Sequence, residues 1–114
     1  MASSVTSERV LKLYNVLEIL RSRGGREFPL QLASALLYIA SHDGLLQEEL
    51  VEATSMSPSS VSRNVTWLGP RHRLGSEGLK LVRREKDHLD PKRWRLWLTP
   101  EGKQFVRILE SCLD

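Results

Sequence analysis

The stretch SMSPSSVSRNVTWL, Ser55–Leu68, decides the fold that this sequence predicts. Serine dominates its first half, and the whole stretch contains no acidic residue. Ser57 is a strong candidate for a helix N-cap, and Pro58 suits the first helical position because that position needs no backbone N–H. The stretch therefore predicts a short helix over residues 58–68 whose outward face is small and polar.

The two faces of this expected helix differ sharply. At 100° per residue, Val61, Val65 and Leu68 share one narrow apolar face. Short hydroxyl side chains on the opposite face allow close approach to a duplex, and Arg63 there has the geometry to bind O6 and N7 of guanine. A serine-rich helix start that simply meets solvent is the alternative. The side chains that we expect to meet DNA from this helix are Ser57, Ser59, Ser60, Ser62, Arg63, Asn64 and Thr66.

Three further helices are expected before this one. Residues 6–23 carry a wide apolar arc at helical spacing, with Thr6 as the expected N-cap and two glycines at the end. Residues 29–41 and 46–54 fit the next two helices. The helix over 46–54, a short turn and the helix over 58–68 together predict a helix-turn-helix.

A hairpin and a last helix follow. The stretches 79–86 and 93–99 are rich in Val, Leu and Trp and bracket DHLDP, so they predict two paired strands. Thr99 and a following proline open a final helix that reaches residue 113. The fold class is mainly α with a two-stranded β wing, a winged helix-turn-helix. We expect one domain over 1–114, with the DNA-binding part over 45–98.

Basic charge is concentrated in the centre of the chain. Residues 57–103 hold 11 lysines and arginines against 5 aspartates and glutamates, whereas both flanks are net acidic. Such a segment suits a surface that meets phosphates, although a solvated basic face is the alternative. The hairpin residues that we expect at the sugar-phosphate backbone are Arg83, Arg84, Lys86, Lys92, Arg93 and Arg95.

Several classes of protein receive no support. The chain has 114 residues, 40% of them apolar and 27% charged, which is typical of a globular domain. It has no apolar run long enough to span a bilayer, no basic-then-apolar leader, and no zinc spacing of Cys or His. It also lacks a phosphate-binding glycine loop and a nucleophile elbow. We expect a soluble cytoplasmic protein that is not an enzyme and has no metal, cofactor or membrane partner.

Two stretches together resemble a known family. LLQEELVEATSMSPSSVSRNVTWL and LVRREKDHLDPKRWRLWLTPEGKQF resemble the winged helix-turn-helix of the MarR-type transcriptional regulators, over roughly residues 30–113. The resemblance implies a homodimer that binds double-stranded DNA, with the recognition helix in the major groove and the wing in or near the minor groove. It also implies that a wing aspartate orients a neighbouring arginine, here Asp90 and Arg93. The terminal helices, 6–23 and 99–113, are the expected dimerisation surface.

The chain departs from that family in two ways. GPRHRLGSEG, residues 69–78, is an apparent insertion, and its Arg71 and Arg73 either add backbone contacts or belong to a longer solvated loop. The chain is also shorter than a typical member, which puts a small-molecule effector in doubt. The competing function, from another class, is a winged-helix module that binds a protein through the same basic hairpin.

Overall fold

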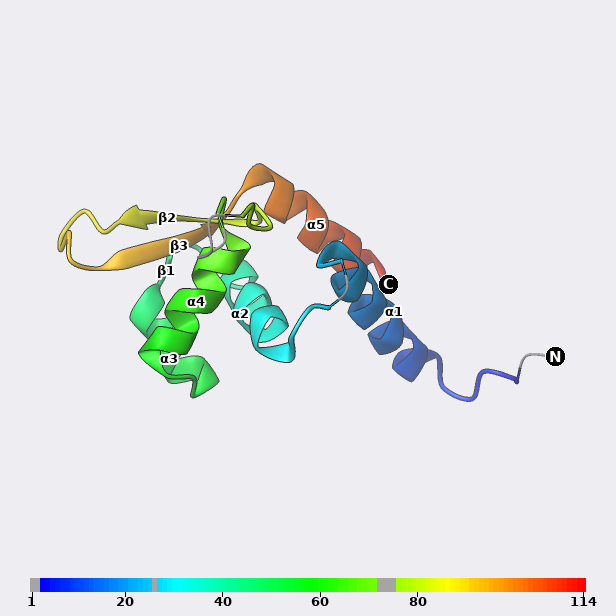
Figure 1. Ribbon diagram of the computed structural model, residues 1–114. Coiled ribbons are helices and arrows are strands. Elements are labelled where there is room, and N and C mark those ends of the chain that lie inside the picture. The colour runs from blue at the N-terminus through cyan, green and yellow to red at the C-terminus, as the bar shows by residue number, and fades with distance from the viewer. Residues whose placement is uncertain (1–2, 26, 72–75) are drawn as a thin grey trace.

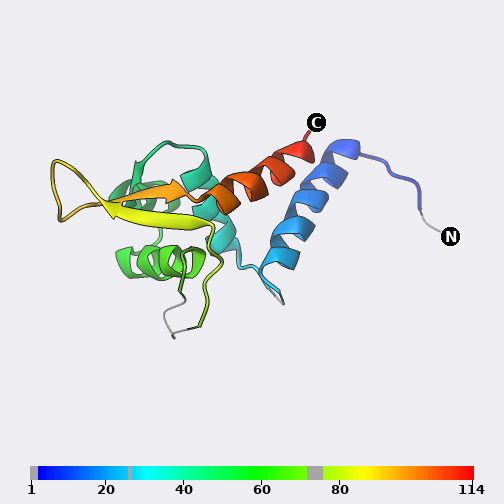
Figure 2. The ribbon, with the colours of Figure 1, turned by 90° about the horizontal axis from the view of Figure 1, so that it is seen from above.

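The computed structural model describes residues 3–25, 27–71 and 76–114. Its long axis is about twice its other dimensions, with extents of 57 × 27 × 27 Å. The wing projects at one end and the first helix lies at the other (Figures 1 and 2). The elements in chain order are α1 (Glu8–Arg23), α2 (Leu30–Ala40), β1 (Leu45–Leu46), α3 (Gln47–Thr54), α4 (Pro58–Leu68), β2 (Val82–Lys86), β3 (Trp94–Leu98) and α5 (Pro100–Ser111).

Hydroxyl caps begin three of the helices. Ser57 accepts a hydrogen bond from the backbone N of Ser60 at 3.1 Å, and α4 has the predicted bounds. Thr99 caps α5 in the same way through the backbone N of Gly102, at 2.9 Å. The prediction for the first helix was wrong by one position, because Ser7 and not Thr6 accepts from the backbone N of Val10.

The described residues form one antiparallel sheet with the strand order β1-β3-β2. The predicted hairpin is confirmed, with Val82 opposite Leu98 and Lys86 opposite Trp94. The strand β1 was not predicted, and Leu46 lies in it and not in the following helix. We call the hairpin and its turn, residues 82–98, the wing.

The first wing strand is shorter than the predicted stretch 79–86. Residues 79 and 81 pair instead with the end of α4: the backbone N of Leu79 donates to Trp67 O at 2.9 Å, and that of Leu81 donates to Leu68 O at 2.8 Å. This segment therefore returns alongside α4 before it joins the sheet, which attaches the base of the wing to the helix.

The core lies where α2 and α4 pack on the sheet. Burying a Leu, Ile or Val side chain stabilises the fold by about 1.5–3 kcal/mol. The apolar face predicted for α4 is confirmed, because Val61, Val65 and Leu68 are fully buried. The other large side chains that are fully buried, among the described residues, are Leu32, Leu36, Ile39, Leu50, Leu81, Val82 and Leu96.

The terminal helices are only partly used by this core. In α1 only Leu20 is buried, while the side chains that precede it on the apolar arc are more than half exposed: Val10, Leu13, Tyr14 and Leu17. In α5, Phe105 and Leu109 are buried within the chain. The apolar stripe of the last helix, Phe105, Leu109 and Leu113, was part of the expected dimerisation surface. Phe105 and Leu109 pack in the core instead, which corrects that expectation for these two residues, whereas Leu113 is exposed.

Candidate nucleic-acid interface

The outward face of α4 is small and polar, with one long basic side chain. Ser59 and Arg63 are exposed, and Ser60, Ser62 and Thr66 are half-buried. Ser57, at the cap, is also exposed. The Nη2 atom of Arg63 donates to Ser60 Oγ at 3.1 Å, so the guanidinium lies along the helix and keeps its other donors. The helix has no acidic residue in its first turn.

Asn64 does not belong to this face, although we expected it there. Its side chain is 8% exposed, and its Nδ2 atom donates to Ser60 O at 2.9 Å. The helical wheel gives the reason, since position 64 lies only about 40° from Leu68 on the buried side. The amide is therefore occupied within the chain.

Three wing arginines are paired with carboxylates. Arg83 Nη1 lies 2.8 Å from Glu85 Oε2, on the same strand. Arg93 forms an ion pair with Glu48 of α3. Arg95 Nε donates to Asp87 Oδ1 at 2.7 Å. A phosphate would have to compete with a carboxylate for each of these guanidinium groups.

The aspartate that holds a wing arginine is Asp87, and the expected pair of Asp90 with Arg93 was wrong. Asp87 is buried, and it accepts a second hydrogen bond from the backbone N of Asp90, at 3.1 Å. Asp90 shapes the turn, because its Oδ1 accepts from the backbone N of Lys92, also at 3.1 Å. Arg95 also donates to Gly44 O at 2.6 Å. Arg95 is thus a structural link between the wing and the loop before β1.

Three other wing cations have no ion pair within the described chain: Arg84, Lys86 and Lys92. The Arg84 guanidinium lies over the Trp94 ring, 5.0 Å from its centroid, and Lys86 Nζ lies 5.9 Å from the same centroid. Stacking restricts both side chains and leaves their charge available. Sequence reasoning missed this role for Trp94, which the observed register of the hairpin places opposite Lys86.

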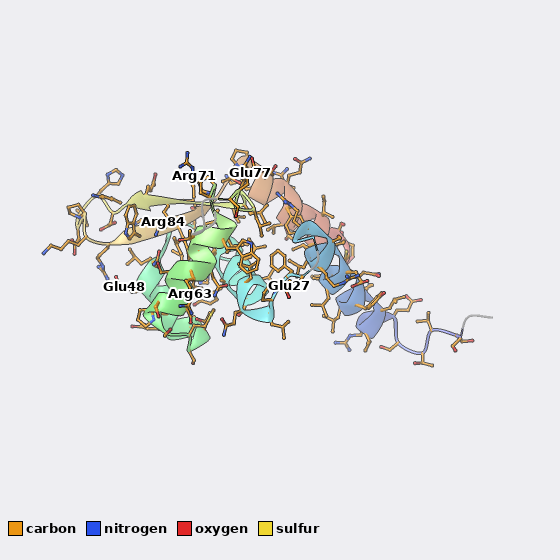
Figure 3. The ribbon with its side chains drawn as sticks, viewed as in Figure 1. Glu27, Glu48, Arg63, Arg71, Glu77 and Arg84 are labelled. Atoms are coloured by element: carbon orange, nitrogen blue, oxygen red, sulfur yellow. The ribbon has the colours of Figure 1, made fainter. Side chains whose placement is uncertain are left out.

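The segment after α4 adds one more described arginine. Arg71 is exposed and forms an isolated β-bridge with Glu77. Arg63, Arg71 and Arg84 thus come from α4, the segment between, and β2 (Figure 3). The expected contact Arg73 lies outside the described residues, as does His72.

The part of the chain that the structure describes offers no cluster of three or more His, Cys, Asp or Glu side chains for a metal ion. Within the same residues no helix has the length and apolarity needed to cross a bilayer.

The fold recurs among solved structures. A DNA complex of MepR from S. aureus is 25% identical and has a TM-score of 0.69, covering 94% of this chain and 77% of that one. A MarR transcriptional regulator from Methanosarcina mazei is 20% identical with a TM-score of 0.67, covering 91% of this chain and 66% of that one. The chain has the MarR-type winged-helix fold. This agrees with the resemblance seen in the sequence.

A structure of overoxidized AbfR bound to DNA is also similar, at 15% identity and a TM-score of 0.65, covering 91% of this chain and 70% of that one. No protein-family model matches the sequence, and no curated protein matches it. Identities this low explain why the relationship is visible in the fold and weak in the sequence.

The Asp87–Arg95 pair predicts an acid-sensitive contribution to stability. The hydrogen bond from Arg95 holds the pKa of the Asp87 carboxyl below its usual range, while burial opposes that shift. A lowered pKa stabilises the folded chain above the unfolded value of about 3.9, and this contribution is lost as pH falls through the folded value. We expect Asp87→Asn to lower the urea midpoint at pH 7, and the difference from wild type to narrow below about pH 4.

Circular dichroism at one protein concentration, from pH 7 to pH 3, measures this difference. Asp43→Asn, at an exposed carboxylate outside the wing, is the control for the loss of one charge. A difference that stays constant over the whole range would show that the charge on Asp87 is not what stabilises the wing.

Proposed function

We propose that this chain is a cytoplasmic, sequence-specific transcriptional regulator that binds double-stranded DNA as a homodimer. Its α4 helix enters the major groove, and its wing lies on the backbone or in the minor groove. The observation that carries the proposal is the placement of Arg63 on an acid-free outward face of α4, together with unpaired cations on the adjoining wing. Solved structures show MepR and AbfR bound to DNA, which supports the same role here.

Base recognition is assigned to Arg63, and phosphate contact to the wing. Arg63 is the one described side chain of α4 with the fork of donors that grips guanine at two atoms. The serines around it are short enough to let the helix backbone approach the duplex. Arg84, Lys86 and Lys92 hold positive charge that no carboxylate of the described residues neutralises, so a phosphate displaces no partner among those residues.

Replacing Arg63 tests the proposed base contact. We expect Arg63→Ala to fold normally, because an exposed helical side chain costs little to truncate. It should weaken binding to a duplex selected from random sequences by about 1–3 kcal/mol, and binding to a random duplex much less. Fluorescence anisotropy at one salt concentration measures both.

Lys92→Ala is the matched control, and it should weaken binding to the two duplexes equally. If Arg63→Ala also weakens both equally, Arg63 is a phosphate contact. If Arg63→Ala changes the affinity for neither duplex, α4 is not in the groove. Binding of a protein partner by the wing is then the better hypothesis.

The exposed face of α1 supports the proposed homodimer. Val10, Leu13, Tyr14 and Leu17 repeat at helical spacing and are more than half exposed, which is costly for a lone chain in water. A second copy of the same helix covers them by two-fold symmetry and places two α4 helices for the two halves of a palindrome.

A charge placed on this face should dissociate the dimer. We expect wild type to sediment as a dimer at micromolar concentration and Leu13→Glu as a folded monomer with weaker binding to the selected duplex, because burying a carboxylate at the interface is unfavourable. Leu30→Glu, at an exposed leucine of α2, is the control and should stay dimeric. A wild type that is monomeric with and without DNA would contradict the proposal.

Glu48 should act as an internal competitor of DNA. Its ion pair with Arg93 is about half exposed, so breaking it has little effect on folding. We expect Glu48→Gln to raise the affinity for a random duplex about three- to tenfold and to steepen the slope of log affinity against log salt by about one, because Arg93 then binds a phosphate.

Glu52→Gln, one turn further along α3, is the control for a general loss of negative charge. The gain from Glu48→Gln should also disappear when Arg93 is already alanine. Weaker binding by Glu48→Gln would show the opposite role, in which the carboxylate orients Arg93 towards the DNA.

A further inference from the structure

A cavity of about 220 Å³ lies where the end of α4 meets the first wing strand. Thr66 and Gly69 line it from the helix end, Arg71 lines it from the segment that follows, and Arg84 lines it from β2. The cavity is therefore bounded by three parts of the chain, two of which each contribute an arginine. Its remaining lining residues are apolar, and none of its described lining is acidic.

The base of the 69–78 segment is held in place by backbone contacts. Gly78 N donates to Pro70 O at 3.1 Å, and Lys80 N donates to Gly69 O at 3.0 Å. The two backbone stretches approach so closely that a Cβ at position 78 would lie 2.1 Å from Gly69 O, so only glycine fits there. These contacts hold the backbone immediately before Arg71 against residues 78–80.

The charges around this cavity are not balanced within the described chain. Arg84 is stacked on Trp94. Neither Arg84 nor Arg71 forms an ion pair with a carboxylate of the described residues. By contrast, Arg83, Arg93 and Arg95 of the same wing are all paired with acids. Two arginines that line one cavity and have no acidic partner among the described residues attract an anion. Their guanidinium forks match phosphate oxygens in shape.

We propose that Arg71 and Arg84 together bind a single phosphodiester of the DNA backbone, at the junction between the recognition helix and the wing. This inference rests on the proposed function and assigns a role to Arg71, in the described part of the 69–78 segment. A phosphate bound by both arginines fixes the position of α4 in its groove relative to the position of the wing on the backbone. The two arginines then set the register of the chain on the duplex without reading any base.

Sharing one phosphate has a measurable signature. The slope of log affinity against log salt reports the number of phosphates neutralised, at about 0.9 per phosphate. If both arginines hold the same phosphate, Arg71→Gln or Arg84→Gln alone leaves it neutralised by the other. Each single variant should then weaken binding about tenfold with little change in slope, whereas the double variant should flatten the slope by about 0.9.

The experiment is a set of anisotropy titrations of the full chain on a random 30-base-pair duplex, between about 50 and 300 mM KCl. Arg107→Gln removes the same charge from an exposed position on α5 and is the matched control, for which we expect no change in slope. Circular dichroism checks that each variant is folded.

Two outcomes would overturn the inference. Slopes that fall by about 0.9 in each single variant and by about 1.8 in the double variant would show that the arginines bind separate phosphates. Unchanged affinity in the double variant would show that the cavity lies off the DNA. A wild type that binds with no salt dependence would instead reject the proposed function, so the two failures are distinguishable.

Discussion

The Arg95 guanidinium joins three segments that are distant in the sequence. It belongs to β3, it donates to the buried Asp87 at the start of the wing turn, and it donates to Gly44 O ahead of β1. A buried carboxylate without a partner is strongly destabilising, so the turn depends on this arginine. The base of the wing and the edge of the sheet are therefore held together by one planar group with several donors. The direction in which the wing leaves the body follows from that link.

Most of the basic side chains of the wing fall into two groups, according to whether each one contacts a carboxylate or only an aromatic ring. Arg83, Arg93 and Arg95 meet acids of the chain itself, whereas Arg84 and Lys86 meet the face of Trp94. An aromatic face orients a cation and leaves its charge available, while a carboxylate neutralises it. A count of basic residues thus overstates the surface available to phosphates. The proposed interface is narrower than the sequence implies, and it is centred on the junction of α4 with β2.

The local signals in the sequence were strong enough to place most elements. Ser57 followed by a proline, and Thr99 followed by another, located the starts of α4 and α5, because capping depends on residues within one turn. The apolar period of α4 identified its buried face for the same reason. The strand β1 was missed because two residues have no period, and Leu45 and Leu46 become a strand only by pairing with Leu96 and Arg95.

The sequence by itself determined the winged helix-turn-helix class, the bounds of α4 and the outward position of Arg63, since each depends on neighbours close along the chain. Only the tertiary structure decided which charges pair. Asp87 and Asp90 are equivalent candidates in the sequence, but the hairpin register brings Arg95 to Asp87 and leaves Asp90 to shape the turn. Glu48 meets Arg93 across 45 positions because α3 packs beside the wing. Ion pairs form between groups that folding brings together, and a linear pattern does not contain that distance.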